Sequence, residues 1–234
     1  MSSRPLVLAH RGASAREPEN TIAAFVTART LGADGVELDA RRTADDVLVV
    51  HHDPHVEGLG VIAEISHAKL RAQHPEIPTL ADALDACTGM LVNVEVKCLP
   101  WEPDSDVADR RVLRAVLDAI RGRDDIVLSS FDLDAMDLAR ARMPELRTAW
   151  LTSRQEFAAA AAIASERGHW GLHPDAAATL AASEEAMASA HDVGLKINVW
   201  TVDDPADARH LKTLGVDGIV TNVPDLILDA VRER

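Results

Sequence analysis

The sequence predicts an α/β protein in which residues 1–234 form a single (β/α)₈ barrel, also called a TIM barrel. Short apolar runs typical of strands alternate with longer amphipathic segments typical of helices, in eight consecutive units. No linker or shift in composition divides the chain, and 234 residues approach the roughly 250 that this fold usually needs. An open doubly wound sheet shares the alternation, but no G-x-G-x-x-G follows the first strand and no Walker A sequence occurs.

The predicted strands are short runs rich in Val, Ile and Leu, bounded by turn-forming residues. In chain order they are Leu6–Ala9, Gly35–Asp39, Leu91–Val96, Ile126–Ser129, Arg147–Leu151, Trp170–Leu172, Lys196–Val199 and Gly218–Thr221.

The predicted helices fill the intervals between these strands. They are Thr21–Leu31, Thr79–Ala86, Ala108–Ile120, Asp132–Arg142, Gln155–Arg167, Ser183–Val193, Pro205–Leu214 and Pro224–Val231. Several begin with a capping side chain or a first-turn proline, as at Asp132, Ser183, Asp204-Pro205 and Asn222-Val223-Pro224.

A second β-rich run, Val47–Val50, follows the second strand after a short polar stretch, and this predicts a β-hairpin extension of the barrel. With Asp45-Asp46 as a two-residue turn, Asp39 lies opposite His52, and Glu37 shares their face. A slip of one residue would bring His51 to that face instead.

Composition narrows the function. The chain has 24 Lys and Arg against 38 Asp and Glu, a formal net charge of −14, which argues against nucleic acid as a partner. No apolar run is long enough for a membrane anchor, and the run after Met1 is too short for a signal peptide. Two cysteines are too few for a disulfide framework, so we expect reduced thiols and a cytoplasmic location. The oligomeric partner is left open.

Three carboxylates lie at the carboxyl ends of predicted barrel strands, which is where enzymes of this fold have their active sites. Glu37 and Asp39 end the second strand, and Glu95 shares a face of the third with Lys97. A buried carboxylate is costly unless it is paired or binds a metal. A simple Glu95–Lys97 ion pair is one interpretation; a divalent cation, Mg²⁺ or Ca²⁺, bound by the three carboxylates is the other.

Two of the ten histidines also follow strands. His10 follows the first strand and His52 follows the hairpin, beside the carboxylates, whereas most of the others fall in polar contexts. His173, at the end of the sixth strand, is a further candidate for the mouth of the barrel.

Together these residues form an ordered set of motifs. In chain order they are His10-Arg11-Gly12, Pro18-Glu19-Asn20-Thr21, Glu37-x-Asp39, His52-Asp53, Ile77-Pro78-Thr79-Leu80, Glu95-x-Lys97 and Trp200-Thr201-Val202. The set resembles the glycerophosphodiester phosphodiesterases from residue 6 to about residue 225. Each motif is weak alone, but their order is specific.

The resemblance implies a (β/α)₈ barrel that hydrolyses glycerophosphodiesters, small deacylated phospholipids, to an alcohol and glycerol 3-phosphate. It implies roles for eight residues: acid–base catalysis for His10 and His52, divalent metal binding for Glu37, Asp39 and Glu95, and substrate binding for Arg11, Lys97 and Trp200. Trp200 could instead be a packing residue of the barrel. Which histidine is the base, whether water or a glycerol hydroxyl attacks, and whether Mg²⁺ or Ca²⁺ binds are left open.

One segment departs from the family pattern. Pro54–Gly60 follows His52-Asp53 in place of the frequent Arg-Thr-Thr stretch, which leaves the preferred head group open. Two other functions are alternatives: a lysophospholipase D or sphingomyelinase D-like enzyme, and a barrel that binds phosphodiesters without cleaving them.

Overall fold

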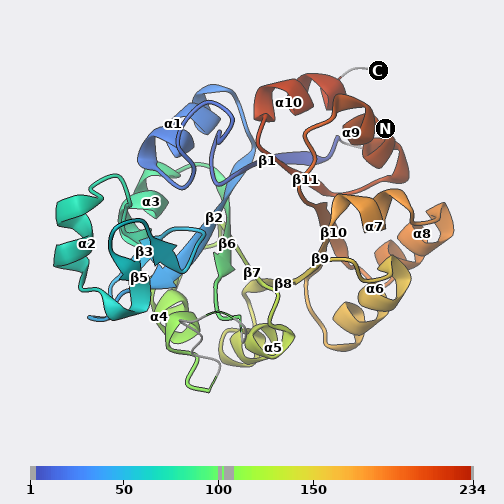
Figure 1. Ribbon diagram of the computed structural model, residues 1–234. Helices are drawn as coiled ribbons and strands as arrows, with labels where there is room; N and C mark the ends of the chain where they lie inside the picture. Colours follow the sequence, from blue (N-terminus) through green and yellow to red (C-terminus); the bar gives the residue numbers. More distant parts are fainter. Residues whose placement is uncertain (1–3, 100–101, 103–107, 233–234) are drawn as a thin grey trace.

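The computed structural model describes residues 4–99, 102 and 108–232, and eight parallel strands form a closed ring in it. The order around the ring follows the chain, which confirms the predicted (β/α)₈ barrel (Figure 1). The eight strands are β1 (Leu6–His10), β2 (Gly35–Arg42), β6 (Leu91–Val96), β7 (Ile126–Ser130), β8 (Arg147–Thr152), β9 (Gly171–Pro174), β10 (Lys196–Val199) and β11 (Gly218–Thr221).

The ring closes through β1, which pairs with the second strand and with the last one. Leu8 of β1 lies opposite Gly35, and Leu6 lies opposite Gly218 of β11. In Figure 1 the blue β1 lies beside the red β11, so the two ends of the ring meet there. The first and last parts of the chain therefore build one wall of the barrel.

Helices surround the ring of strands (Figure 1). They are α1 (Ile22–Thr30), α2 (His67–Gln73), α3 (Leu80–Ala86), α4 (Arg111–Ala119), α5 (Leu133–Arg142), α6 (Phe157–Glu166), α7 (Ala176–Leu180), α8 (Glu184–Asp192), α9 (Pro205–Leu214) and α10 (Pro224–Arg232), with a 3₁₀ turn η1 at Ile62–Glu64. Within the described ranges, none of these helices has the length and apolar character needed to cross a membrane.

The capping side chains account for where many helices begin. Asp132, Ser183 and Asp204 each accept a hydrogen bond from a backbone N–H in the first turn, as predicted. Two short helices of seven and five residues, α2 and α7, were not predicted. Helix α4 begins at Arg111, three residues later than predicted, because Arg110 adopts a left-handed conformation.

The hairpin after β2 forms, but its predicted register is wrong by one residue. Ala40 pairs with Val50 of β3 (Leu48–Val50), so Asp39 lies opposite His51 rather than His52. The turn has three residues, 44–46, because Asp46 adopts a positive φ of 64° and adds a residue to the loop. The strand ends at Val50, so strand alternation does not set the direction of His52. A small hairpin, β4 (His55–Val56) with β5 (Gly60–Val61), follows.

Gly12 lies in the tight turn that leads from His10 toward α1. Its φ is 82°, and a Cβ atom added there would lie 2.6 Å from the Cβ atom of Ala24. Gly58 has a similar φ of 74°, but nothing lies within 4 Å of a Cβ atom at that position. A larger residue at either position would therefore strain the backbone, and of the two only a residue at position 12 would also clash with a neighbouring side chain.

We predict that Gly12→Ala lowers the free energy of unfolding more than Gly58→Ala does. Gly58→Ala should cost about 1 kcal/mol, from the left-handed backbone alone. Gly12→Ala should cost about 2–4 kcal/mol, because overpacking against α1 adds to that strain. Urea denaturation of both variants measures the difference, and equal losses would contradict the close approach of the turn to α1.

Candidate active site

A cavity of about 200 Å³ opens at the carboxyl-terminal end of the barrel. Each barrel strand, or the residue that follows it, contributes to the cavity wall, and the loop after β3 adds one more residue. The lining residues are His10, Arg11, Glu37, His52, Asn93, Glu95, Lys97, Phe131, Leu151, His173, Trp200 and Val220. Seven of the eight predicted site residues are in this set, and the eighth, Asp39, is buried in contact with Lys97.

Three carboxylates meet beside the cavity because two parallel strands bring them together. Glu37 and Asp39 are two residues apart on β2 and so share one face. Asp39 lies opposite Glu95 of the neighbouring β6 in the strand register. One oxygen of each of the three carboxylates lies within 4.8 Å of the others, and all three residues are buried.

Lys97 holds two of these carboxylates by ion pairs. Its Nζ atom lies 2.9 Å from Asp39 Oδ1 and 2.6 Å from Glu95 Oε1. Burial by itself would lower the pKa of the Lys97 ammonium, but the two carboxylates outweigh it and raise that pKa. The predicted Glu95–Lys97 ion pair is therefore present, as part of a larger charged cluster.

The pKa values of the carboxylates show that this cluster is short of positive charge. Burial, followed by repulsion from Asp39 and Glu95, raises the pKa of Glu37 well above its ordinary value. Burial also raises the pKa of Glu95, although Lys97 opposes it. Only Asp39, beside Lys97 and Arg11, has a pKa below its ordinary value, because their charges overcome its burial. Three carboxylates thus share two cationic side chains.

The donor set fits a divalent cation. Glu37 Oε1 is buried without a hydrogen-bond partner, and the cluster contains only oxygen donors. Hard ions such as Mg²⁺ and Ca²⁺ take carboxylate oxygen ligands, and an added positive charge would allow Glu37 and Glu95 to ionise. Glu37, Asp39 and Glu95 are the residues that would hold such an ion.

His10 is oriented by a chain of hydrogen bonds from residues far from it in sequence, which follow β10 and β11. The Asn222 amide donates through Nδ2 to Asp203 Oδ2 at 2.7 Å, so its Oδ1 atom faces His10 Nδ1 at 2.8 Å. Because Oδ1 can only accept, His10 carries a proton on Nδ1 and leaves Nε2 for a ligand. Burial lowers the pKa of His10, followed by repulsion from Arg11, which favours the neutral ring.

His52 also lines the cavity and has a similar arrangement. Its Nδ1 atom lies 2.7 Å from Asp53 Oδ1, and since a carboxylate only accepts, Nδ1 carries the proton. Burial, followed by repulsion from Lys97, lowers the pKa of the ring. On the neutral rings of both histidines, Nε2 is therefore the nitrogen that carries no proton, and in His10 it lies 3.9 Å from Glu37 Oε2.

Arg11 and Asn20 complete the polar part of the site. The Arg11 guanidinium forms an ion pair with Glu19 at 2.9 Å, and its Nε atom lies 3.4 Å from Asp39 Oδ2. Asn20 is buried and donates through Nδ2 to Asp39 Oδ2 at 2.8 Å. The cap of α1 is Thr21, so Asn20 serves the carboxylate rather than the helix.

The opposite wall of the cavity is apolar. The rings of Phe131 and Trp200 pack edge to face, with centroids 5.6 Å apart and planes at 85°. Leu151 and Val220 extend this wall. Trp200 both lines the cavity and packs in the barrel, and its indole N–H donates to the His173 carbonyl at 2.9 Å.

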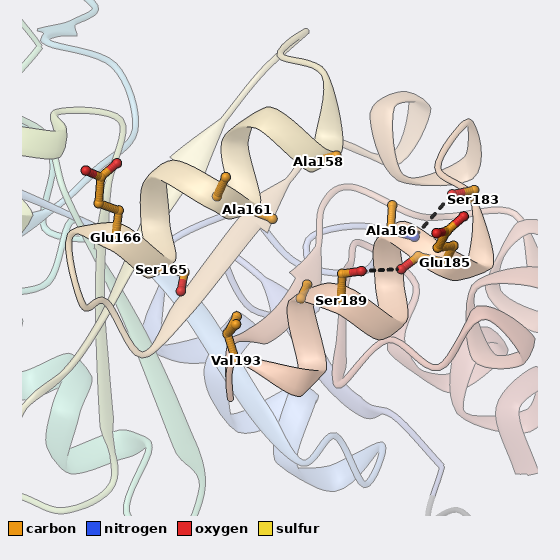
Figure 2. Close-up of a pocket in the computed structure, with 11 residues that line it drawn as sticks. Ala158, Ala161, Ser165, Glu166, Ser183, Glu185, Ala186, Ser189 and Val193 are labelled. Atoms are coloured by element: carbon orange, nitrogen blue, oxygen red, sulfur yellow. Dashed lines mark hydrogen bonds between the residues drawn. The ribbon is translucent and has the colours of Figure 1, made fainter.

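A larger cavity, of about 580 Å³, lies between α6 and α8 on the outside of the ring. Figure 2 shows it lined by small side chains such as Ala158, Ala161 and Ser189, with Glu166 and Glu185 at its edges. Among the described residues that line it there is no Lys, Arg or His. It offers nothing that would attract or activate an anionic substrate.

The sequence analysis missed several residues that support this site. Asp203 and the role of Asn222 toward His10 were not predicted, because hydrogen bonds over such sequence separations leave no local pattern. Phe131 and Leu151 were missed as lining residues, although each falls at a strand end; Trp200, also at a strand end, was assigned from the family resemblance.

Comparison with known proteins gives one family over nearly the whole chain. The model of the glycerophosphoryl diester phosphodiesterase family matches residues 10–226. A glycerophosphodiester phosphodiesterase of Caldanaerobacter subterraneus is 29% identical over 98% of this chain and 99% of its own length. A probable glycerophosphodiester phosphodiesterase of Mycobacterium tuberculosis is 30% identical over 98% of this chain and 91% of its own length.

Solved structures agree with this result. A glycerophosphodiester phosphodiesterase of Thermotoga maritima superposes with a TM-score of 0.84 at 27% identity, covering 98% of this chain and 99% of that one. An Oleispira antarctica phosphodiesterase, solved in complex with the product sn-glycerol-3-phosphate, gives a TM-score of 0.85 at 25% identity and covers 98% of each chain.

The buried His173 yields a prediction for stability against pH. Burial lowers its pKa to about 3, and its Nε2 atom accepts from the Asn198 amide at 3.1 Å. Between pH 6.5 and 3 the unfolded chain therefore binds a proton here that the folded chain does not. Proton binding at His173 in the unfolded chain therefore lowers the free energy of unfolding by about 1.4 kcal/mol for each unit by which the pH decreases in this range.

We predict that His173→Gln removes this contribution. The decrease in the free energy of unfolding from pH 7 to pH 5, measured by urea denaturation, should be about 2 kcal/mol smaller than in the wild type. His210→Gln, at an exposed position on α9, should follow the wild type. An unchanged pH dependence in His173→Gln would contradict the neutral buried state of this histidine.

Proposed function

The chain belongs to the glycerophosphoryl diester phosphodiesterase family, and on that premise we propose that it cleaves glycerophosphodiesters into an alcohol and sn-glycerol 3-phosphate by acid–base catalysis between His10 and His52. As a member of this family it is a phosphoric diester hydrolase.

One observation carries the proposal: two imidazoles and the acidic cluster face the same cavity of about 200 Å³. The Oleispira antarctica phosphodiesterase of similar fold binds sn-glycerol-3-phosphate, described there as the product. The cavity is also smaller than the roughly 300–1,000 Å³ usual for ligand sites, which favours a small deacylated diester over a lipid with an acyl chain. This argues against the lysophospholipase D and sphingomyelinase D alternatives.

Hydrolysis of a phosphodiester needs a base for the attacking hydroxyl and an acid for the departing alcohol. In our proposal one imidazole, neutral, accepts the proton of the attacking group at Nε2. The other, protonated, donates from Nε2 to the leaving oxygen. Attack by water gives glycerol 3-phosphate directly, whereas attack by the neighbouring glycerol hydroxyl gives a cyclic phosphate that a water molecule then opens to glycerol 3-phosphate. Asn222 and Asp53 accept from Nδ1 of His10 and His52, and so keep each ring in the orientation and tautomer that its role requires.

Arg11 and Lys97 supply positive charge for the phosphate in this proposal. Both line the cavity while they also balance the buried carboxylates. When bound at Glu37, Asp39 and Glu95, a divalent cation would act as a Lewis acid that stabilises the negative charge of the transition state. Trp200 and Phe131 form the wall for the carbon atoms of the substrate. The cytoplasmic location and the exclusion of nucleic acid as a partner stay predictions.

We predict that His10→Ala and His52→Ala each lower kcat by at least about 10²-fold, because each removes one proton transfer. The assay follows release of glycerol 3-phosphate from glycerophosphocholine, with lysophosphatidylcholine as the comparison substrate. His51→Ala is the matched control, because its ring bonds to the Asp53 carbonyl and is not part of the cavity wall. Circular dichroism checks that each variant is folded. Full turnover in either His10→Ala or His52→Ala would refute the acid–base pair.

We also predict that chelation by EDTA lowers turnover by about 10²-fold or more, and that Mg²⁺ or Ca²⁺ restores it. Glu37→Gln should bind the restoring ion more weakly, which isothermal titration calorimetry measures without any turnover. Wild-type activity after exhaustive chelation, with no binding of either ion, would contradict the metal assignment.

A further inference from the structure

Arg41 is a fully buried arginine beside the site that has no role in the proposal above. It follows Glu37 and Asp39 at alternate positions on β2, so it shares their face of the strand and lies nearer the mouth of the barrel. Its side chain is 1% exposed. A guanidinium is rarely buried to this extent unless its N–H groups are paired in good geometry.

Among the residues that the structure describes, two acceptors pair with the guanidinium. Its Nε atom donates to the backbone carbonyl of His52 at 2.8 Å, and Nη2 donates to the same oxygen. Nη1 and Nη2 also donate to the two carboxylate oxygens of Glu102, at 3.0 and 2.9 Å. The planar guanidinium thus binds Glu102 by two parallel bonds and faces His52 with its other edge.

This contact accounts for the place of His52, which the hairpin register does not. The β2–β3 ladder puts His51 opposite Asp39 and ends at Val50, so the ladder leaves His52 unpaired with β2. The ring of His52 nevertheless faces the cavity. His52 forms hydrogen bonds with the side chains of Asp53 and Arg41. The side chain of Asp53 is 70% exposed, whereas that of Arg41 is buried, so Arg41 is the more rigidly held of these two partners.

We propose that Arg41 is a positioning residue for His52: the guanidinium, itself oriented by Glu102, holds the His52 carbonyl so that His52 stays in the wall of the cavity that His10 also lines. This inference rests on the proposed role of His52. Arg41 is not part of the cavity wall, so it acts through His52 rather than on the substrate.

If Arg41 and Glu102 formed only a structural ion pair, the expected results would differ. The pair would contribute to stability, and its loss would leave turnover unchanged in every variant that still folds. A positioning role predicts a loss in kcat with little change in KM, because a displaced His52 impairs proton transfer and leaves ground-state binding in place.

The test compares Arg41→Lys, which keeps the charge but cannot serve both acceptors, with Arg42→Lys. Arg42 is the next residue on the opposite face of β2 and pairs with Asp46. We expect kcat of Arg41→Lys to fall about 10- to 100-fold, as is usual when a residue that orients a functional group is replaced. KM should change less than about threefold, and Arg42→Lys should keep the wild-type kcat.

Two further variants keep the test decisive if Arg41→Lys is unstable. Glu102→Gln leaves Arg41 in place but weakens its orientation, so it should lower kcat in the same direction by a smaller factor. In Arg41→Ala, added guanidinium ion should restore part of the lost kcat, because it can occupy the space that the side chain leaves.

A readout without turnover separates this inference from the proposed function. NMR of histidine-labelled protein, with His52→Ala to assign the signal, should show a shifted His52 ring in Arg41→Lys and an unshifted one in Arg42→Lys. Turnover that persists in His52→Ala refutes the proposed role of His52, whatever Arg41 does. An unshifted ring and wild-type kcat in folded Arg41→Lys and Glu102→Gln overturn the positioning role alone.

Discussion

The whole site depends on one electrostatic constraint: three carboxylates are buried together and must be balanced by nearby positive charge. Lys97 lies between Asp39 and Glu95, with its ammonium 2.9 and 2.6 Å from them. Arg11 adds a second cation, which still leaves one negative charge in excess. Leaving this charge buried would be costly, so the cluster favours either a proton on Glu37 or a bound cation. A divalent cation bound there would bring the charge of the cluster to about +1, which would let an anionic substrate approach a chain of net charge −14.

The part of the site that the sequence predicted is the part that strand geometry determines. Alternation on a strand places Glu37 with Asp39 and Glu95 with Lys97, and the parallel register of β2 and β6 then joins the two pairs. The eight strands were predicted for the same reason, since each is a short apolar run between breakers. These features are local in sequence, or follow from neighbouring strands in a known topology, and so need no knowledge of distant contacts.

The rest could not be predicted, because it depends on single backbone angles or on distant partners. The positive φ of Asp46 lengthens the hairpin turn by one residue and shifts the register, and no alternation pattern reports that angle. His52 was predicted at the cavity for the wrong reason: beyond the end of the ladder, its backbone carbonyl accepts from the side chain of Arg41 on the neighbouring strand β2. The N-cap residues of several helices could be predicted from the local sequence. The hydrogen bond between His10 and Asn222 could not, because it joins residues 212 positions apart.

That last pairing has a consequence for how the protein matures. The Asn222 amide that orients the ring of His10 is synthesised 212 residues after it. The strand that carries Asn222 to it, β11, is also the one that closes the ring against β1. A nascent chain can therefore bury much of its core and assemble its acidic cluster, which needs only β2 and β6, while still lacking an oriented imidazole. The ring of His10 therefore gains its hydrogen-bond partner only when β11 completes the barrel, so the acid–base pair that we propose would be the last part of the site to form.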